Sequence, residues 1–475
     1  MDSKEAICFV RSHMQCAALH ESICLASYSF IVQQTKIQFL DRLLRQEFFM
    51  GVREKIKSNI RNNLNREYFR RLLGILARKP ILYTYGSTFS SIADKYLNIY
   101  TIENIRDSYD KRKPVVFGSL FLPYELFHAL DTVPFLPEVM AGFTAGLGLA
   151  DQTLKKASSS WYSQDLCTFH RSASGAVEMD LFPDPAFIIC TNLACDAAQK
   201  SFYHYSVTYG IEKNYHLLDV PYDNDPDSIK YLAGQLEKLA QSISNITGKD
   251  IDREKMSRTI ELSNELREYA LKINNIRKEL RSYPGNFNGL NFILPFHGLI
   301  GTENAVKLYK SVCQELESLL KKQKEKDPVR TPKKILWMHL KPYYKTEIFD
   351  IIARGNCIVA AEEINNVYWS RMDPEKPYES LAKKMLSHPL TGKASNRIKA
   401  LGEMLDGYGI DGGVLFTHWG CRQSNGSTRL IKDYFNSRGI PVLVLDGDCV
   451  DRTNSSEGQV NTRLQGFIEI LGARP

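Results

Sequence analysis

The feature that most constrains the fold of this chain is a repeated alternation of short apolar runs with longer helix-like stretches. In the first series the apolar runs occupy residues 114–118, 186–190 and 216–220, and helix-like segments follow them at 124–129, 195–205 and 227–244. A second series of apolar runs lies at residues 335–339, 357–361, 413–417 and 442–445. Strands that alternate with helices are typical of parallel sheets covered by helices. We therefore predict an α/β protein with two parallel sheets.

The charged stretch 321–334, which contains two prolines and little to bury, separates the two series and predicts a hinge. We divide the chain into a helical N-terminal segment (1–110), a first α/β domain (111–325) and a second α/β domain (326–475). The first domain includes a helical insert with stretches at 252–280 and 304–320. Both α/β domains are expected to be Rossmann- or flavodoxin-like, with functional loops at the carboxyl ends of the strands in the cleft between them.

Composition narrows the classes of function. The 475 residues carry 61 basic and 54 acidic side chains, a net charge of +7 that is spread along the chain, so nucleic acid is not an expected partner. The first residues contain charges where an export signal would be apolar, and no apolar run approaches the roughly 18 residues of a membrane span. We expect a cytoplasmic protein, without a membrane partner, whose ten cysteines are reduced.

Three cysteines stand out because of their position. Cys195 and Cys421 each follow a predicted strand, and Cys167 lies in the stretch YSQDLCTFHR at 162–171. Cysteine thiolates are the usual ligands of iron–sulfur clusters, and three ligands leave one iron open. The separations of 28 and 226 residues match neither a ferredoxin motif nor a zinc knuckle. Spacing alone therefore leaves open the alternative that these thiols are simply buried, which is common for cysteine.

The segments around these cysteines resemble the subunits of the ATP-activated 2-hydroxyacyl-CoA dehydratases (D-component) and the related ATP-dependent benzoyl-CoA reductases. The resemblance includes the stretch PVVFGSLFLPYEL at 114–126, FLPE at 135–138, LDVPY at 218–222, PGNFNG at 284–289, LDGD at 445–448 and NTRLQGFIE at 461–469. These matches follow the order of the family's motifs from about residue 113 to the C-terminus.

The resemblance implies that Cys167, Cys195 and Cys421 hold one [4Fe-4S] cluster in the cleft between the domains, with no NAD and no flavin. It also implies a reaction in which an ATP-hydrolysing iron–sulfur activator protein delivers one electron, the cluster passes it to the thioester of an acyl-CoA substrate, and a ketyl radical expels water. A homologous second subunit, or a second copy of the chain, would complete a dimer. The closely paired cysteines of a double-cubane relative are absent from this sequence.

Five residues beside two of the cysteines could contact the cluster, the phosphates of CoA or the partner subunit: His418, Trp419, Arg422, His170 and Arg171. An N–H donor or a cation near a cluster raises its potential, and an aromatic ring excludes water. The alternative is a packed tryptophan and solvated arginines.

Glu138 and Ser119 are the candidate catalytic residues, because they match positions that line the substrate site in one of the two subunit types. Leu120 occupies the position nearest the serine that contacts substrate in that subunit type, and Glu138 could instead cap a helix. Asp446 and Asp448, at the end of the last predicted strand, are expected to form hydrogen bonds with nearby backbone groups rather than to bind Mg²⁺.

The leading hypothesis is thus a hydro-lyase, the iron–sulfur subunit of a 2-hydroxyacyl-CoA dehydratase. One alternative is a benzoyl-CoA reductase-like subunit that reduces an acyl-CoA. The other is a non-catalytic electron-transfer or scaffold subunit, which the single serine at 119 and the N-terminal segment favour.

Overall fold

The two predicted sheets are present, each with four parallel strands. The structure is a computed structural model and describes residues 92–160, 162–283, 288–325 and 331–474. The first sheet contains β1 (Val115–Gly118), β2 (Val133–Phe135), β3 (Phe187–Thr191) and β4 (Tyr215–Leu218). The second contains β5 (Lys333–Met338), β6 (Cys357–Glu362), β7 (Gly412–His418) and β8 (Val442–Gly447). Every neighbouring pair is parallel, which confirms the predicted α/β class.

Both sheets have the same strand order, β2-β1-β3-β4 in the first and β6-β5-β7-β8 in the second. The chain therefore leaves the first strand of each sheet toward one edge and returns on its other side. The loops that follow the first and third strands diverge, which opens a crevice at the carboxyl ends of these strands. The third strand of each sheet extends farther at this edge. Gly118 at the end of β1 pairs with Ile189, two residues before the end of β3, and Met338 at the end of β5 pairs with Leu415, three residues before the end of β7.

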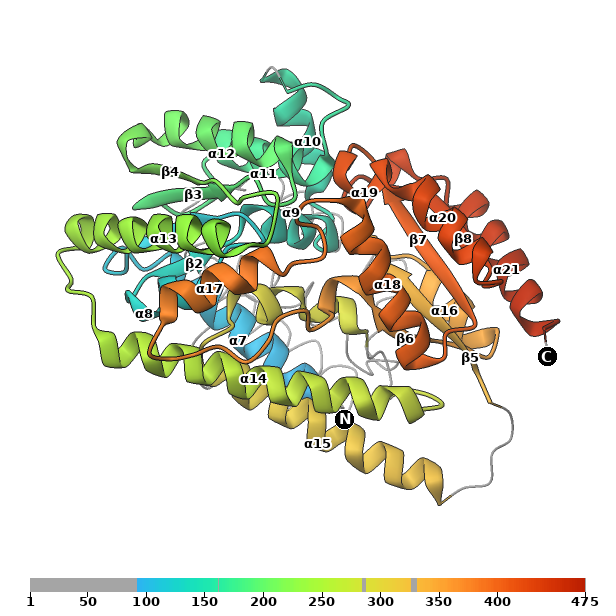
Figure 1. The fold of residues 1–475 in the computed structure, drawn as a ribbon. Helices are drawn as coiled ribbons and strands as arrows, with labels where there is room; N and C mark the ends of the chain where they lie inside the picture. The colour runs from blue at the N-terminus through green and yellow to red at the C-terminus, as the bar shows by residue number, and fades with distance from the viewer. Residues whose placement is uncertain (1–91, 161, 284–287, 326–330, 475) are drawn as a thin grey trace, which may run out of the picture.

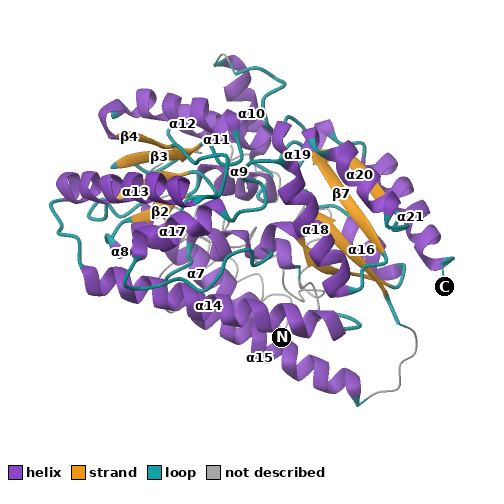
Figure 2. Ribbon diagram, in the orientation of Figure 1, coloured by secondary structure: helices purple, strands orange, loops and turns teal. Residues whose placement is uncertain are grey.

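Helices cover both faces of the sheets (Figure 2). Those of the first part are α7 (Ile92–Ser108), α8 (Tyr124–Ala129), α9 (Pro137–Gly146), α10 (Ala150–Ser159), α11 (Thr168–Glu178), α12 (Asp196–Tyr209), α13 (Pro226–Thr247), α14 (Arg253–Glu279) and α15 (Glu303–Lys324). Those of the second part are α16 (Ile348–Arg354), α17 (Pro377–Leu386), α18 (Ala394–Tyr408), α19 (Arg422–Gly426), α20 (Thr428–Ser437) and α21 (Glu457–Gly472). Short 3-10 turns at Glu212–Asn214, Gly289–Phe292, Glu363–Asn365 and Arg452–Asn454, and a π turn at Leu294–Gly298, lie between them.

Capping residues explain where the long helices begin. The side chains of Asp225, Asp252 and Thr302 accept hydrogen bonds from backbone N–H groups in the first turns of α13, α14 and α15, at 2.8, 3.1 and 3.2 Å. These bonds satisfy donors that the helix itself leaves free. α13 ends at Gly248, whose φ of 69° is the left-handed conformation that glycine adopts easily.

The two parts of the chain are packed together. α14 and α15 run side by side beneath both sheets, and α17, although it belongs to the second series, lies between α13 and α14 (Figure 1). Trp369, Met372 and Leu381 share a buried apolar cluster with α13 and α14 residues. The predicted boundaries at 110/111 and 325/326 stay predictions, and residues 1–91 and 326–330 of the predicted N-terminal segment and hinge lie outside the described ranges.

One strand was not predicted from the sequence. β2 contains three residues and has Pro134 at its centre, so it shows no alternating or extended apolar pattern. Proline is tolerated there because β2 is at the edge of its sheet. Among the helices in the described ranges, none combines the length and apolarity that a membrane crossing requires.

Candidate functional site

A large cavity lies at the carboxyl ends of both sheets. Its volume is about 990 Å³, and residues from both parts of the chain line it. Ser119 and Cys195 follow β1 and β3 of the first sheet, and His339 and Cys421 follow β5 and β7 of the second. These are the loops at the topological switch point of each sheet, where ligands bind in open α/β folds. Parts of the chain far apart in sequence thus meet at one site.

All three predicted ligand cysteines line this cavity. Cys167 precedes α11, Cys195 precedes α12 and Cys421 precedes α19, so each sulfur is at the N-terminal end of a helix. Backbone N–H groups of the first turns lower the pKa of these thiols and so favour the thiolate. A helix N-terminus is a favourable place for a negatively charged ligand.

Burial raises the pKa of these thiols when no cation is bound, and so opposes the effect of the helix N-termini. It raises the pKa of both Cys195 and Cys421 to about 11, and that of Cys167 well above its usual range. The neighbouring thiols raise the pKa of Cys167 further, so the three sulfurs are close enough for their charges to interact. Such a group of thiols remains protonated near neutral pH until a cation replaces the protons.

Two loops approach closely at Gly420. Its φ is 73°, and a Cβ atom built there would lie 2.5 Å from the backbone nitrogen of Cys167. Glycine therefore permits the loops that carry Cys167 and Cys421 to touch.

The chemistry of the donor set fits an iron–sulfur cluster. Three cysteine sulfurs face one cavity from three separate loops, each at the N-terminal end of a helix. No group of three or more His, Cys, Asp or Glu side chains in the described ranges is arranged around a point where one metal ion would fit. A cluster of four irons is larger than an ion, and its ligands lie farther apart. Cys190, in contrast, is fully buried within β3 and belongs to the apolar core.

Each of the three predicted ligand cysteines has a histidine beside it. The Nε2 atom of His418 is 3.3 Å from the Cys167 sulfur, that of His170 is 3.3 Å from the Cys195 sulfur, and that of His339 is 3.5 Å from the Cys421 sulfur. His418 and His170 were among the predicted residues, and His339 was missed. Its position directly after β5, equivalent to that of Ser119 after β1, is a signal that could have identified it.

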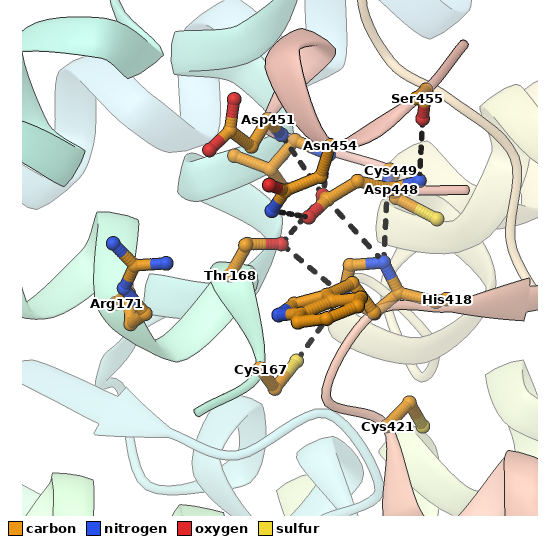
Figure 3. A network of polar contacts seen from close by, with 12 residues as sticks. Cys167, Thr168, Arg171, His418, Cys421, Asp448, Cys449, Asp451, Asn454 and Ser455 are labelled. Atoms are coloured by element: carbon orange, nitrogen blue, oxygen red, sulfur yellow. Dashed lines mark hydrogen bonds and ion pairs between the residues drawn. The ribbon is translucent and has the colours of Figure 1, made fainter. Parts of the chain in front are cut away.

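The loop after β8 holds His418 in place. The Asp448 carboxylate accepts hydrogen bonds from the N–H groups of Val450 and Asp451 at 2.8 and 2.9 Å, which confirms its expected role in ordering this loop. It also accepts a 2.6 Å hydrogen bond from the hydroxyl of Thr168, the residue after Cys167 (Figure 3). This bond joins the two parts of the chain beside the cavity. Burial lowers the pKa of His418 to about 4, so its ring is neutral at pH 7.

The other predicted cofactor contacts differ in position. Arg422 lines the cavity and forms a 2.6 Å ion pair with Asp196. Arg171 and Trp419 are not among the lining residues, and both donate hydrogen bonds to the Gln164 carbonyl. The guanidinium of Arg171 lies apart from the contact between Cys167 and His418 in Figure 3. The roles predicted for these residues stay predictions.

The two candidate catalytic residues, Glu138 and Ser119, line the same cavity. Glu138 is in the first turn of α9, and its enclosed Oε2 atom has no hydrogen-bond partner in the described part of the chain. Burial raises the pKa of Glu138 to about 7, although nearby His170 lowers it. The Ser119 hydroxyl accepts a 3.3 Å hydrogen bond from the Thr191 N–H.

Comparison with known proteins identifies the family. A profile of the 2-hydroxyglutaryl-CoA dehydratase D-component family matches residues 119–471. The (R)-phenyllactyl-CoA dehydratase alpha subunit of Clostridium sporogenes is 25% identical over 367 residues, which cover 74% of this chain and 88% of the relative. The (R)-2-hydroxyisocaproyl-CoA dehydratase alpha subunit of Clostridioides difficile is 21% identical over 416 residues, which cover 81% of this chain and 95% of the relative. The match to the profile includes β2, β3 and β4 of the first sheet, the whole second sheet and all three cysteines, and the chain belongs to the 2-hydroxyglutaryl-CoA dehydratase D-component family.

Proposed function

We propose that this chain is the [4Fe-4S] subunit of a 2-hydroxyacyl-CoA dehydratase, which passes one electron from an ATP-hydrolysing activator to an acyl-CoA thioester so that water is eliminated. One observation carries the proposal: three cysteines from three loops, each at the start of a helix, face one cavity at the carboxyl ends of both sheets. A homologous subunit would complete the enzyme, as the names of the related alpha subunits suggest.

Cys167, Cys195 and Cys421 would hold the cluster, which when bound supplies a one-electron reductant beside the thioester. The chain would contribute the three ligands and the helix N-termini that favour the thiolates. Because burial keeps the empty thiols protonated, loading must release protons and will be more favourable at higher pH.

The remaining space in the cavity would hold the acyl group. A volume of about 990 Å³ is at the upper end of the range for small-molecule sites. Apolar side chains such as Phe121 and Leu294 line it together with Glu138 and Ser119. Loss of a hydroxyl group needs a proton, and Glu138, with a pKa of about 7, is partly protonated at neutral pH. We assign Glu138 to proton donation to the leaving hydroxyl and Ser119 to substrate contact.

The first test is chemical analysis of the anaerobically purified chain. We expect a brown protein with about four irons and four sulfides per chain. Cys195→Ser should lose most of this iron, whereas Cys313→Ser, which changes a buried cysteine on α15 outside the cavity, should retain it. A colourless wild-type chain, or a Cys195→Ser variant with full iron content, would contradict the proposal.

The second test identifies the reaction. The loaded chain, its partner subunit, the activator, ATP and a reductant are assayed with a panel of acyl-CoA compounds. Loss of water without net electron consumption supports a dehydratase, and net consumption of electrons indicates a reductase. An acyl-CoA that leaves the spectrum of the chain's cluster unchanged would indicate a supporting subunit.

A further inference from the structure

The environment of the three cysteines has a regularity that the family assignment does not explain. Each sulfur is within 3.5 Å of the Nε2 atom of a different histidine, in the pairs Cys167–His418, Cys195–His170 and Cys421–His339. The three histidines come from three different places in the chain: the end of β7, the first turn of α11 and the residue after β5.

We propose that these three histidines each donate a ring N–H hydrogen bond to one ligand sulfur, and that His339 thereby raises the reduction potential of the site. The inference rests on the proposed function, because it requires the three cysteines to be cluster ligands. Hydrogen bonds to the sulfurs stabilise the more negative, reduced state of a cluster, and so raise its potential.

The hydrogen bonds around His418 establish which of its nitrogens carries the proton. The backbone N–H of Cys449 points to Nδ1 at 3.0 Å, and a backbone N–H can only donate, so Nδ1 is the acceptor. The proton of the neutral ring is therefore on Nε2, which faces the Cys167 sulfur and the Thr168 hydroxyl. Thr168 gives its own proton to Asp448 and can only accept from the ring.

The direction of the other two bonds follows from the state of the sulfur. A cysteine that binds iron has lost its proton, so it can accept a hydrogen bond but cannot donate one. The Nδ1 atoms of His170 and His339 are buried without a hydrogen-bond partner in the described ranges, so neither ring has a competing contact that would draw its proton from Nε2.

His339 is held in an unusual conformation that places its ring at Cys421. Its φ is 71°, in the left-handed region that residues other than glycine seldom adopt, and such residues are frequent at functional sites. Its backbone N–H donates to the Glu363 carboxylate at 3.2 Å, and Arg397 binds the same carboxylate at 2.6 and 2.8 Å. Arg397 also donates to the Ser424 carbonyl, three residues after Cys421. One buried ion pair thus fixes both members of the contact.

The first experiment uses the unmodified, iron-loaded chain with ¹⁵N-labelled histidine. Pulsed electron paramagnetic resonance of the reduced state should show coupling to histidine nitrogen. Because each ligand has its own donor, coupling is expected whichever iron carries the unpaired spin. A loaded chain without this coupling would overturn the inference and leave the proposed function intact. A chain that holds no iron would refute the proposed function, and the inference with it.

The second experiment measures the midpoint potential of variants. At a fixed solution potential, His339→Ala should lower the reduced-to-oxidised ratio by about tenfold, which corresponds to about 59 mV for a one-electron couple. His339→Gln keeps an N–H donor and should recover much of this loss. His128→Gln changes a histidine on α8 that bonds the Gly298 carbonyl, and neither of these residues lines the cavity, so this variant should leave the potential unchanged. An unchanged potential in a loaded His339→Ala variant would overturn the role of His339. If that variant holds no iron, the coupling to histidine nitrogen in the labelled wild-type chain remains the test of the hydrogen bonds.

Discussion

Gly420 is the position where a single added carbon should separate the two halves of the site. In Gly420→Ala the new Cβ would lie 2.5 Å from the backbone nitrogen of Cys167, 2.7 Å from its Cα and 2.8 Å from the Asp165 carbonyl oxygen. All three are backbone atoms, so no flexible side chain can move to make room. The φ of 73° is an additional penalty for any residue with a Cβ.

The magnitude follows from these two terms. The left-handed conformation costs about 1–2 kcal/mol for an alanine. Overpacking that shifts backbone costs about 1–3 kcal/mol more. We expect Gly420→Ala to lower the free energy of unfolding by about 2–5 kcal/mol, measured by urea denaturation, and to reduce iron incorporation because the loops of Cys167 and Cys421 move apart.

The matched control is Gly426→Ala in the same segment. A Cβ at Gly426 would meet no atom within 4 Å, so the change should alter stability by less than about 0.5 kcal/mol and leave iron binding intact. If Gly420→Ala unfolds and binds iron as the wild type does, the two loops do not touch as described, and the geometric basis for a shared site is refuted.

Three further predictions concern the groups that surround the site. Arg277→Met leaves the Glu362 carboxylate buried without the partner that now binds it at 2.6 and 2.7 Å, and should cost about 3–5 kcal/mol in urea unfolding; a loss below about 1 kcal/mol would contradict the importance of this pair. Thr168→Val removes the hydroxyl that joins the two parts at Asp448 and should cost about 1–3 kcal/mol by the same assay, and unchanged stability would show that the contact is dispensable. Because the folded pKa of Glu138 is raised from 4.5 to about 7, the folded state holds this proton more tightly, and stability should fall by up to about 3 kcal/mol as pH rises from 4.5 to 7. Glu138→Gln should remove this part of the pH dependence, and identical pH profiles for variant and wild type would refute the raised pKa.

Local sequence patterns predicted the strands and long helices well because those elements satisfy local rules. The apolar runs at 114–118 and 413–417 coincide with β1 and β7 to within one residue at each end. The predicted helix at 252–280 differs from α14 by only one residue at each end. Asp252, whose side chain caps the first turn, marks the start of this helix in the sequence. β2 was not predicted, because its three residues form a strand by pairing with β1 and show no strand pattern of their own.

Packing between distant segments could not be predicted in this way. α17 lies within the second series in sequence, between β6 and β7, yet Lys384 on it forms a buried 2.6 Å ion pair with Glu125 on α8. Nothing in either segment identifies the other as its partner. For the same reason the cysteine separations carried little information, and only the resemblance to the family placed Cys167, Cys195 and Cys421 together.

The strand order that the two sheets share explains why a site forms at the carboxyl ends of their strands. Ser119 and His339 follow the first strand of their sheets, and Cys195 and Cys421 follow the third, so the two halves present equivalent positions to one cavity. Cys167 follows no strand, and its place depends on contacts with the second half at Gly420 and Asp448. The three proposed ligands therefore come together only when the halves are docked. A cofactor that binds only the docked form must stabilise the docking itself, so loss of the cofactor should loosen the contact between the halves before either sheet unfolds.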